Sequence, residues 1–149
     1  MYDAIIIGAG PAGLSAAVGM AFLKLKSLIV DARQAGGALI QVYPWKKVDY
    51  FGFYDLTGRE LAEIFVRHVK KYGIGIKEGE EALEIKKTND GFEVITTKNT
   101  YKGKTVILAT GVIGTPRRLG VEGENLKGCL LYTSPSPRDL STSRMPSSA

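Results

Sequence analysis

The stretch that decides the fold is "AIIIGAGPAGLSAA", residues 4–17. It begins inside an apolar, isoleucine-rich run at residues 2–7 that stops at a glycine, as a buried strand does. Residues 13–24 then have the composition of a helix with an alanine-rich face. A second apolar run at residues 27–30 ends at Asp31 and predicts another buried strand. These segments together predict a βαβ unit.

Three glycines in this stretch have the G-x-G-x-x-G spacing of dinucleotide-binding folds. Gly8 permits a tight turn, Gly10 lets the backbone approach a pyrophosphate, and Gly13 lets the helix approach the strand. The helix N-terminus offers free N–H groups and a partial positive charge to phosphates. Asp31 follows at about the spacing at which a carboxylate accepts from ribose hydroxyls. A glycine turn of an unrelated α/β protein is the alternative, and the motif alone leaves FAD and NAD both open.

Further along the chain, the sequence predicts a long loop, a helix and more strands. Residues 35–55 are rich in glycine and turn residues and predict a loop whose length is typical of functional segments. Thr57 and Glu60 fit a capping box at the start of a helix that Gly73 ends. The other predicted strands are residues 74–76, 82–87, 92–97, a strand from Tyr101, and a buried strand at 105–109.

Composition excludes several classes of protein. The chain of 149 residues is 44% hydrophobic and 23% charged, which is typical of a globular domain. Its net charge of +5 is spread along the chain in short pairs, so we expect no nucleic-acid interface. Residues 4–23 are uncharged, but their glycines and Pro11 would break a spanning helix, so no membrane span is predicted. The single Cys129 cannot form an internal disulfide, which favours a reducing, cytoplasmic compartment.

Three motifs together resemble a known family. "GAGPAGLSAA" at 8–17 and "VILATG" at 106–111 resemble the FAD domain of the pyridine nucleotide–disulfide reductase superfamily. The loop "AGGALIQVYPWKKVDYFGF" at 35–53 is similar to that of thioredoxin-reductase-like ferredoxin/flavodoxin–NADP reductases, and "TPRRLGVEGE" at 115–124 is similar to the segment that follows. The resemblance implies an α/β fold: a truncated Rossmann-like FAD-binding domain with a parallel sheet and a β-meander crossover.

The resemblance also implies which residues contact FAD. It places Tyr43 against the isoalloxazine ring and the backbone of Leu83 near the adenine, while the Leu83 side chain is expected in the core. The usual Gln after the glycine pair is Ala38 here, so its hydrogen bond is absent or supplied elsewhere, for example by Gln41. Thr110 has strand-end packing as its alternative role. No catalytic or metal-binding residue is predicted, and His68 is expected in solvent. The predicted FAD contacts are Gly8, Gly10, Pro11, Ala12, Gly13, Asp31, Ala32, Gly37, Ala38, Tyr43, Leu83, Ala109, Thr110 and Gly111.

The activity implied by the resemblance is that of an NAD(P)H-dependent flavoprotein oxidoreductase. In such an enzyme, hydride passes from NADPH or NADH to the flavin, and electrons leave to a ferredoxin or flavodoxin. One alternative is a thioredoxin reductase that carries its cysteine pair in a further domain and serves a thioredoxin-type protein. Another alternative is a nucleotide-binding module without turnover. The resemblance further implies a homodimer.

The last residues, "CLLYTSPSPRDLSTSRMPSSA" at 129–149, differ from the rest of the chain. They are rich in Ser and Pro and have neither helical nor strand periodicity. A flexible tail is one explanation, but the segment resembles translated sequencing adapter, which favours a non-native tail. We therefore expect residues 1–128 to be a partial FAD-binding domain, without turnover by itself, from a protein about twice this length.

Overall fold

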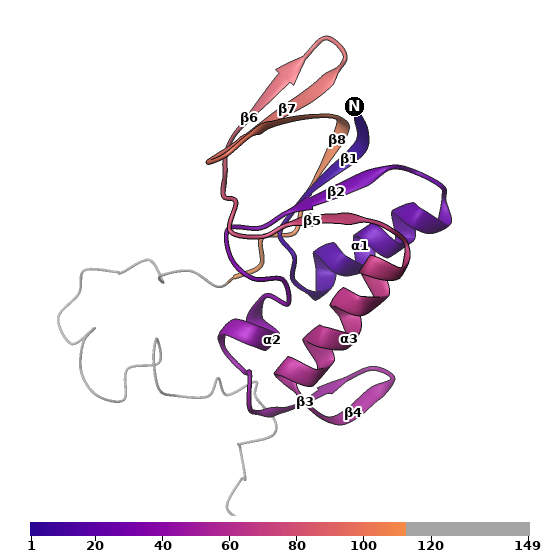
Figure 1. Cartoon of the computed structure of the whole chain (residues 1–149), viewed down its shortest axis with the longest axis vertical. Helices are drawn as coiled ribbons and strands as arrows, with labels where there is room; N and C mark the ends of the chain where they lie inside the picture. The colour runs from indigo at the N-terminus through magenta and orange to yellow at the C-terminus, as the bar shows by residue number, and fades with distance from the viewer. Residues whose placement is uncertain (113–149) are drawn as a thin grey trace, which may run out of the picture. The chain divides into compact units, whose positions relative to one another are not determined.

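The computed structural model describes residues 1–112, which form one six-stranded sheet, a two-stranded sheet and three helices (Figure 1). The helices are α1 (Pro11–Phe22), α2 (Ala38–Gln41) and α3 (Gly58–Lys71). The strands are β1 (Tyr2–Ile7), β2 (Ser27–Val30), β3 (Lys47–Tyr50), β4 (Phe53–Thr57), β5 (Gly75–Lys77), β6 (Ala82–Thr88), β7 (Gly91–Thr96) and β8 (Thr100–Leu108).

The large sheet has the strand order β5-β2-β1-β8-β7-β6. Neighbouring strands from β5 to β8 pair in parallel, whereas β6, β7 and β8 form an antiparallel meander. After β5 at one edge of the sheet, the chain crosses to β6 at the other edge. The meander of β6, β7 and β8 then brings it back, so that β8 pairs with β1 on the side opposite β2. This arrangement confirms the predicted α/β architecture with its meander crossover.

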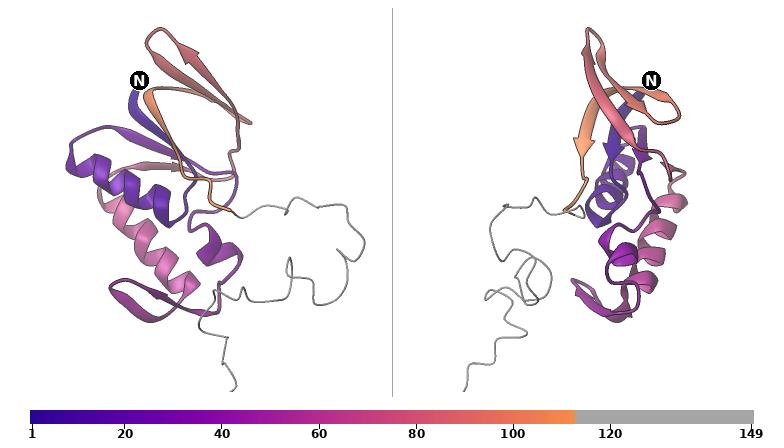
Figure 2. Two further views of the ribbon diagram at one scale, coloured as in Figure 1. Left: turned by 180° about the vertical axis from the view of Figure 1, so that it is seen from behind. Right: turned by 90° about the vertical axis from the view of Figure 1, so that its left-hand side faces the viewer.

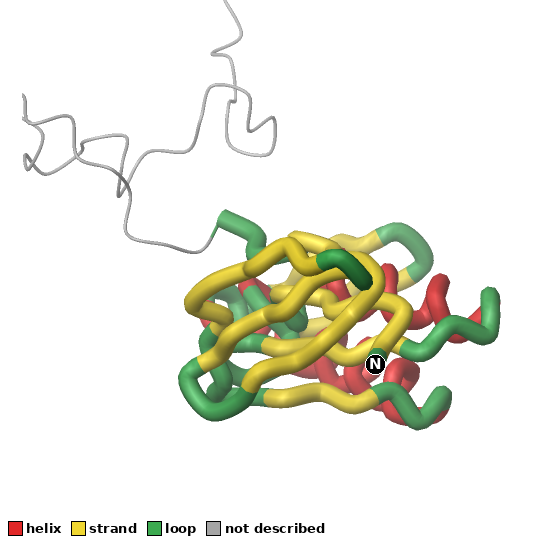
Figure 3. The backbone as a smooth tube through the Cα atoms, turned by 90° about the horizontal axis from the view of Figure 1, so that it is seen from above, coloured by secondary structure: helices red, strands yellow, loops and turns green. Residues whose placement is uncertain are grey.

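The two faces of the parallel strands are covered by different elements. On one face, Ile6 and Ile29 pack in a cluster with Leu14 of α1 and Val69 of α3. These two helices run side by side in both views of Figure 2, and the strands curve over the helices when seen from above (Figure 3). On the other face, the buried residues Ile5, Leu28 and Val30 cluster with Val94 of β7. Alternation along β1 and β2 therefore builds two cores, because successive side chains point to opposite faces of a sheet.

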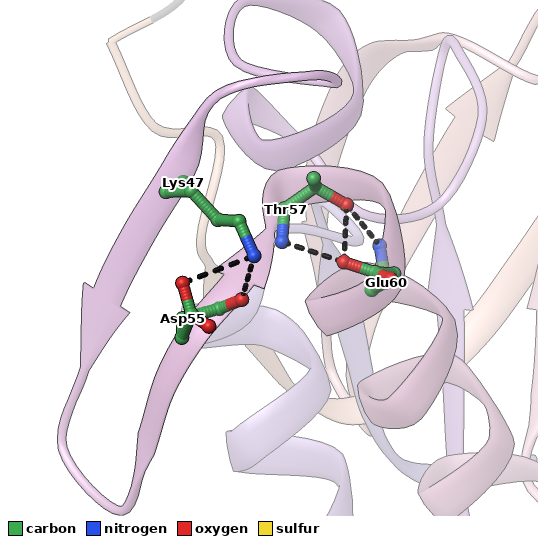
Figure 4. Close-up of polar contacts among 4 residues, drawn as sticks. All are labelled: Lys47, Asp55, Thr57 and Glu60. Atoms are coloured by element: carbon green, nitrogen blue, oxygen red, sulfur yellow. Dashed lines mark hydrogen bonds and ion pairs between the residues drawn. The ribbon is translucent and has the colours of Figure 1, made fainter.

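The ends of α3 follow the sequence signals closely. The Glu60 N–H donates to Thr57 Oγ1 at 3.3 Å, and Glu60 Oε2 accepts from the Thr57 N–H at 2.8 Å (Figure 4). The hydrogen bonds that the carboxylate accepts from the Thr57 N–H and from the Thr57 hydroxyl hold the pKa of Glu60 below its ordinary value. At the other end, Gly73 has a φ of +68°, which stops the helix. The predicted capping box and helix end are therefore confirmed.

Helix α1 begins two residues earlier than predicted, at Pro11. Proline suits the first helical position because its ring fixes a helical φ and its missing N–H would have no intrahelical acceptor there. The helix ends at Phe22, because Lys24 takes a positive φ of 57°. The predicted strand pairs around the turn at residues 88–91 are present as β6 and β7.

The prediction of a loop over residues 35–55 is wrong, because this segment contains α2, β3 and the start of β4. Lys47 and Asp55 form an ion pair of 3.1 Å across the β3–β4 hairpin (Figure 4). The hairpin also contacts α3: the ring of Phe65 lies 5.1 Å from that of Tyr50 and 5.8 Å from that of Phe53. Contacts with a helix later in the chain, rather than local periodicity, stabilise these strands.

The last two predicted strands form a single strand, β8. Gly103 pairs with Tyr2 of β1 on one side and Phe92 of β7 on the other, and a Cβ there would lie 3.0 Å from Ile5 Cγ1. A side chain at this position would crowd Ile5 of the core, so glycine suits it. The expected burial of residues 105–109 is also wrong, because Leu108 is 67% exposed. Among residues 1–112, no element covers the side chain of Leu108 at that end of the sheet.

Candidate nucleotide-binding site

The carboxyl ends of β1, β2 and β8 lie at one edge of the sheet, because these strands are parallel neighbours. The glycine turn follows β1, Asp31 follows β2, and Thr110 comes shortly after β8. A pocket of about 290 Å³ brings these segments together. Open α/β sheets bind ligands outside the carboxyl ends of their strands, so this pocket is the candidate site. Its lining residues are Ile7, Gly8, Val30, Asp31, Ala32, Arg33, Gln41, Glu81, Ala82 and Thr110.

Gly8 and Gly13 are required by contacts between backbone segments. Gly8 has a φ of +110°, and a Cβ there would overlap the carbonyl oxygen of Ala109. A Cβ on Gly13 would overlap the carbonyl oxygen of Gly8 and lie 3.3 Å from Ile6 Cγ2. These two glycines let β8 and α1 approach the end of β1, which shapes the floor of the site.

Gly10 stands in different surroundings. A Cβ on Gly10 would meet only the Cα of Gly37, at 3.8 Å, and its φ of −76° is open to any residue. The fold itself therefore tolerates a side chain here, and the open space is available to a ligand. Gly10 caps α1 without a side-chain hydrogen bond, and the N–H groups of Ala12 and Gly13 have no intrahelical acceptor. Such an end suits a phosphate group.

Gly37 joins the glycine turn to α2. It has a φ of +57°, and a Cβ there would lie 2.8 Å from the Cα of Gly10. Its neighbour Gly36 donates its N–H to the carbonyl oxygen of Ala9 at 2.8 Å. Ala38 then begins α2 immediately beside this contact. The predicted residues Gly37 and Ala38 therefore lie next to the glycine turn, although neither lines the pocket.

The Asp31 carboxylate is held in one orientation. Its Oδ2 accepts from the Ala9 N–H at 2.6 Å, and its Oδ1 accepts from the Arg33 N–H at 2.8 Å. Each carboxylate oxygen has a second lone pair and can accept another hydrogen bond. The side chain lines the pocket and is half-buried. Asp31 thus ties β2 to the glycine turn and still presents acceptor capacity to a hydroxyl-bearing ligand.

The segment after β8 also borders the site. The Ala109 N–H donates to the carbonyl oxygen of Ile7 at 2.8 Å, which continues the β1–β8 pairing beyond the end of the strand. Thr110 is exposed and lines the pocket, so strand-end packing does not explain it. Gly111 follows with a φ of +67°.

Six lining residues were not among the predicted contacts: Ile7 and Val30 at the ends of β1 and β2, and Arg33, Gln41, Glu81 and Ala82. Arg33 and Gln41 line one part of the pocket, and the Arg33 guanidinium donates to the side-chain oxygen of Gln41. Gln41 thus reaches the pocket as the sequence suggested, although its oxygen already has a partner. Arg33 lies two residues after Asp31, which is a usable signal. Glu81 lies in the β5–β6 connection and Ala82 is the first residue of β6, so both are brought in only by the crossover.

Four of the fourteen predicted residues line the pocket, namely Gly8, Asp31, Ala32 and Thr110. Of the other ten, only Tyr43 and Leu83 lie outside the glycine turn with the first turn of α1, the start of α2 and the segment after β8. Tyr43 is 42% exposed, and the ammonium of Lys46 lies 5.8 Å from the centre of its ring. Leu83 is 61% exposed, so its predicted place in the core is wrong. The reason is that β6 is an edge strand of the meander, and its residues beyond Ala82 are exposed. Its neighbour Ala82, not Leu83, has its surface in the pocket.

A metal-binding cluster and a membrane-spanning helix are both absent from residues 1–112. No group of three or more His, Cys, Asp or Glu side chains within residues 1–112 is arranged to hold a metal ion. No helix within the same residues has the length and apolar character needed to cross a membrane. His68 is exposed on α3, as predicted. The segments 115–124 and 129–149 lie outside the described residues.

Known proteins share both the sequence and the fold. Residues 45–145 match the sequence profile of a family described as pyridine nucleotide-disulphide oxidoreductase. The chain is 36% identical over 127 residues to a ferredoxin--NADP reductase of Ignicoccus hospitalis, covering 84% of this chain and 41% of the relative. It is 38% identical over 128 residues to a ferredoxin--NADP reductase of Sulfurisphaera tokodaii, covering 83% of this chain and 39% of the relative. The chain therefore spans about two fifths of the length of these curated relatives.

Solved structures agree with these relatives. Thioredoxin reductase of T. acidophilum superposes with a TM-score of 0.71 at 42% identity, covering 83% of this chain and 39% of that one. The bacillithiol disulfide reductase of Staphylococcus aureus superposes with a TM-score of 0.70 at 26% identity, covering 84% and 43%. Both the reductase resemblance and the fold class inferred from the sequence are confirmed.

Proposed function

Because this chain belongs to the pyridine nucleotide-disulphide oxidoreductase family, we propose that it is the FAD-binding portion of an NAD(P)H-dependent flavoprotein oxidoreductase. The observation that carries the proposal is the pocket at the carboxyl edge, where Gly8, Asp31, Ala32 and Thr110 come together from separate segments. Bound FAD would supply a ring that takes up a hydride from a nicotinamide and passes electrons on.

The chain's own residues would bind and orient the dinucleotide. Asp31 would accept from ribose hydroxyls, since its orientation is already fixed by two backbone N–H groups. Gly10 and the first turn of α1 would receive the pyrophosphate, because the space beside Gly10 is open. Tyr43 would stack on the isoalloxazine, and the segment from Ala109 to Gly111 would approach the flavin nucleotide. These roles for the predicted site residues are part of the proposal.

For the electron acceptor we propose a ferredoxin or flavodoxin. The support is that the curated relatives from Ignicoccus hospitalis and Sulfurisphaera tokodaii are named ferredoxin--NADP reductase. The nicotinamide donor would be NADPH or NADH, held by a part of the protein beyond this chain. A cytoplasmic homodimer is the assembly and location that the family resemblance implies.

A thioredoxin reductase is the second candidate. The structure from T. acidophilum that bears this name shares 42% identity, more than either ferredoxin--NADP reductase above. A thioredoxin-type partner would need a redox pair of cysteines, and this sequence contains one cysteine. Sequencing the full reading frame distinguishes the two: a Cys-x-x-Cys in a second dinucleotide domain supports the thioredoxin reductase.

Flavin binding is the direct test of the proposed function. Purified full-length protein should be yellow and should show flavin absorbance, and titration of its apoprotein with FAD should quench flavin fluorescence. Gly10→Val should abolish FAD binding while the melting temperature falls only slightly, because its side chain occupies the ligand's space rather than the fold's. Protein that binds NADH but no flavin would contradict the proposal. If the full-length protein binds FAD but does not reduce a dye with NAD(P)H, the non-catalytic nucleotide-binding module is favoured.

We also propose that residues 129–149 are not part of the native domain. The alignments to the relatives cover 83–84% of the chain, which is consistent with a native part that ends near residue 128, although the family profile extends to residue 145. Deleting residues 129–149 should leave the melting temperature and the FAD affinity unchanged. A clear fall in either quantity would show that these residues contribute to the domain.

A further inference from the structure

Glu80 is a buried carboxylate that the proposed function does not use. It lies in the connection between β5 and β6 and is 3% exposed. A buried charge is costly unless it is hydrogen-bonded, so its partners indicate what it does. The carboxylate lies next in sequence to Glu81, a lining residue of the nucleotide pocket.

The side chain of Glu80 is bound by three donors from β7, β8 and the turn between them. Oε1 accepts from the Thr96 hydroxyl at 2.6 Å and from the Asn99 side-chain amide at 3.2 Å. Oε2 accepts from the Tyr101 hydroxyl at 3.2 Å. Burial by itself would raise the pKa of Glu80, but these three hydrogen bonds outweigh it and hold the pKa below its ordinary value. The group is therefore a carboxylate at neutral pH.

The backbone around Glu80 binds the other side of the pocket. The Glu80 N–H donates to the carbonyl oxygen of Asp31 at 2.9 Å, and the Gly79 N–H donates to that of Arg33 at 3.3 Å. The Glu81 N–H and carbonyl oxygen pair with Thr97 at 3.2 and 2.9 Å. One short segment thus connects Asp31, which follows β2, to the turn between β7 and β8.

We propose that Glu80 is a positioning residue of the nucleotide pocket. Its side chain anchors the β5–β6 connection to the meander, and its backbone holds the end of β2, so that Asp31, Glu81 and Ala82 keep the spacing an adenosine-containing ligand requires. Glu80 itself does not line the pocket and acts through its neighbours. The inference rests on the proposed nucleotide-binding function.

The test compares ADP affinity with stability in the 149-residue chain and four variants. Glu80→Ala removes the anchor and should weaken ADP binding by about tenfold, because small displacements of binding groups have large effects. Glu80→Gln should stay within about threefold of the unsubstituted chain: its oxygen still accepts from Thr96 and Asn99, and its amide can donate to the Tyr101 oxygen. Titration calorimetry gives the affinity, and circular dichroism gives the melting temperature.

Val69→Ala is the control for a purely structural role. Val69 is buried in α3 on the helix-covered face of the sheet, so its truncation should lower the melting temperature at least as much as Glu80→Ala does. Its core cluster contains none of the donors to Glu80 and no lining residue of the nucleotide pocket, so ADP affinity should remain within about twofold. If affinity falls in proportion to melting temperature in both variants, Glu80 has no positioning role and the inference is wrong.

The remaining outcomes are also decisive. If Glu80→Ala does not fold, Tyr101→Phe removes one of the three donors and should weaken ADP binding about threefold. If Glu80→Ala folds and its ADP affinity is unchanged, this inference is wrong but the proposed function stands. The same holds if Glu80→Ala does not fold and Tyr101→Phe folds with unchanged ADP affinity. An unsubstituted chain that binds neither ADP nor FAD overturns the proposed function and, with it, this inference.

Discussion

The turn between β1 and α1 and the segment from α2 to β4 meet at Gly10 and Gly37, yet they are specified in opposite ways. In the turn, backbone lies against backbone, and Gly8 and Gly13 leave no room for a side chain. In the segment from α2 to β4, side chains such as Tyr50 and Phe53 determine the structure by contacting Phe65 of α3. The first kind of structure depends on how closely backbone segments approach: Gly13 meets Gly8 in the same turn, and Gly8 meets Ala109 after β8. The second depends on a helix that follows it.

The largest effect is expected in the turn. Gly13→Ala should lower the free energy of unfolding by about 3 kcal/mol or more, because the new Cβ overlaps the Gly8 carbonyl oxygen and α1 must move. Gly19→Ala is the matched control in the same helix, where a Cβ meets nothing within 4 Å. It should raise the free energy of unfolding by about 0.5–1 kcal/mol. Urea denaturation measures both free energies of unfolding. Equal effects would show that position 13 is no more constrained by backbone contacts than position 19.

An intermediate effect is expected in the hairpin. Phe65→Ala should lower the free energy of unfolding by about 2 kcal/mol, less than for a fully buried phenylalanine, because the side chain is half-buried. Amide hydrogen exchange should rise in β3 and β4 and stay slow in β1 and β2. Phe51→Ala, at a fully exposed position of the hairpin turn, should change stability by less than about 0.5 kcal/mol. Protection of β3 that survives Phe65→Ala would show that the hairpin is locally stable.

The smallest effect on stability is expected at Tyr43, which the proposed function places against the flavin. Tyr43→Ala should change the free energy of unfolding by less than about 1 kcal/mol, because the side chain is 42% exposed. It should nevertheless alter the fluorescence and the reduction potential of bound flavin. Tyr54→Ala, at 82% exposure in the β3–β4 hairpin, is the control and should alter neither property. Identical flavin spectra in both variants would show that Tyr43 does not contact the flavin.

The same contrast explains how much of the fold could be predicted from the sequence. Gly13 meets Gly8 within one turn, and the capping box joins Thr57 to Glu60, so their spacing suffices to predict the turn and the helix start. The contact of Gly8 with Ala109, far along the chain, is not encoded in that spacing. The β3–β4 hairpin has no such signature, because Phe65 contributes to its stability from outside. Leu83 was misplaced for a related reason: an apolar residue on an edge strand can face solvent, and sequence alone does not reveal what covers it.

The candidate site divides in the same way. Asp31 and Thr110 follow strands and could be predicted from motifs at strand ends. Glu81 and Ala82 reach the pocket only because the chain crosses the sheet and returns, which no local pattern encodes. The hydrogen bonds from Ala9 and Arg33 to Asp31 could not be foreseen either, since they depend on the turn's geometry.

The position of β1 between β2 and β8 has a consequence for synthesis of the chain. Asp3 and Lys104 form an ion pair of 2.7 Å although they are 101 positions apart, and the whole β1–β8 pairing spans a similar separation. At ribosomal speeds this interval takes about 5–20 s, during which one edge of an isoleucine-rich strand has no partner. Non-local pairing is slow, and an open apolar edge invites pairing with other chains. We therefore expect the nascent chain to depend on chaperones until β8 has emerged from the ribosome.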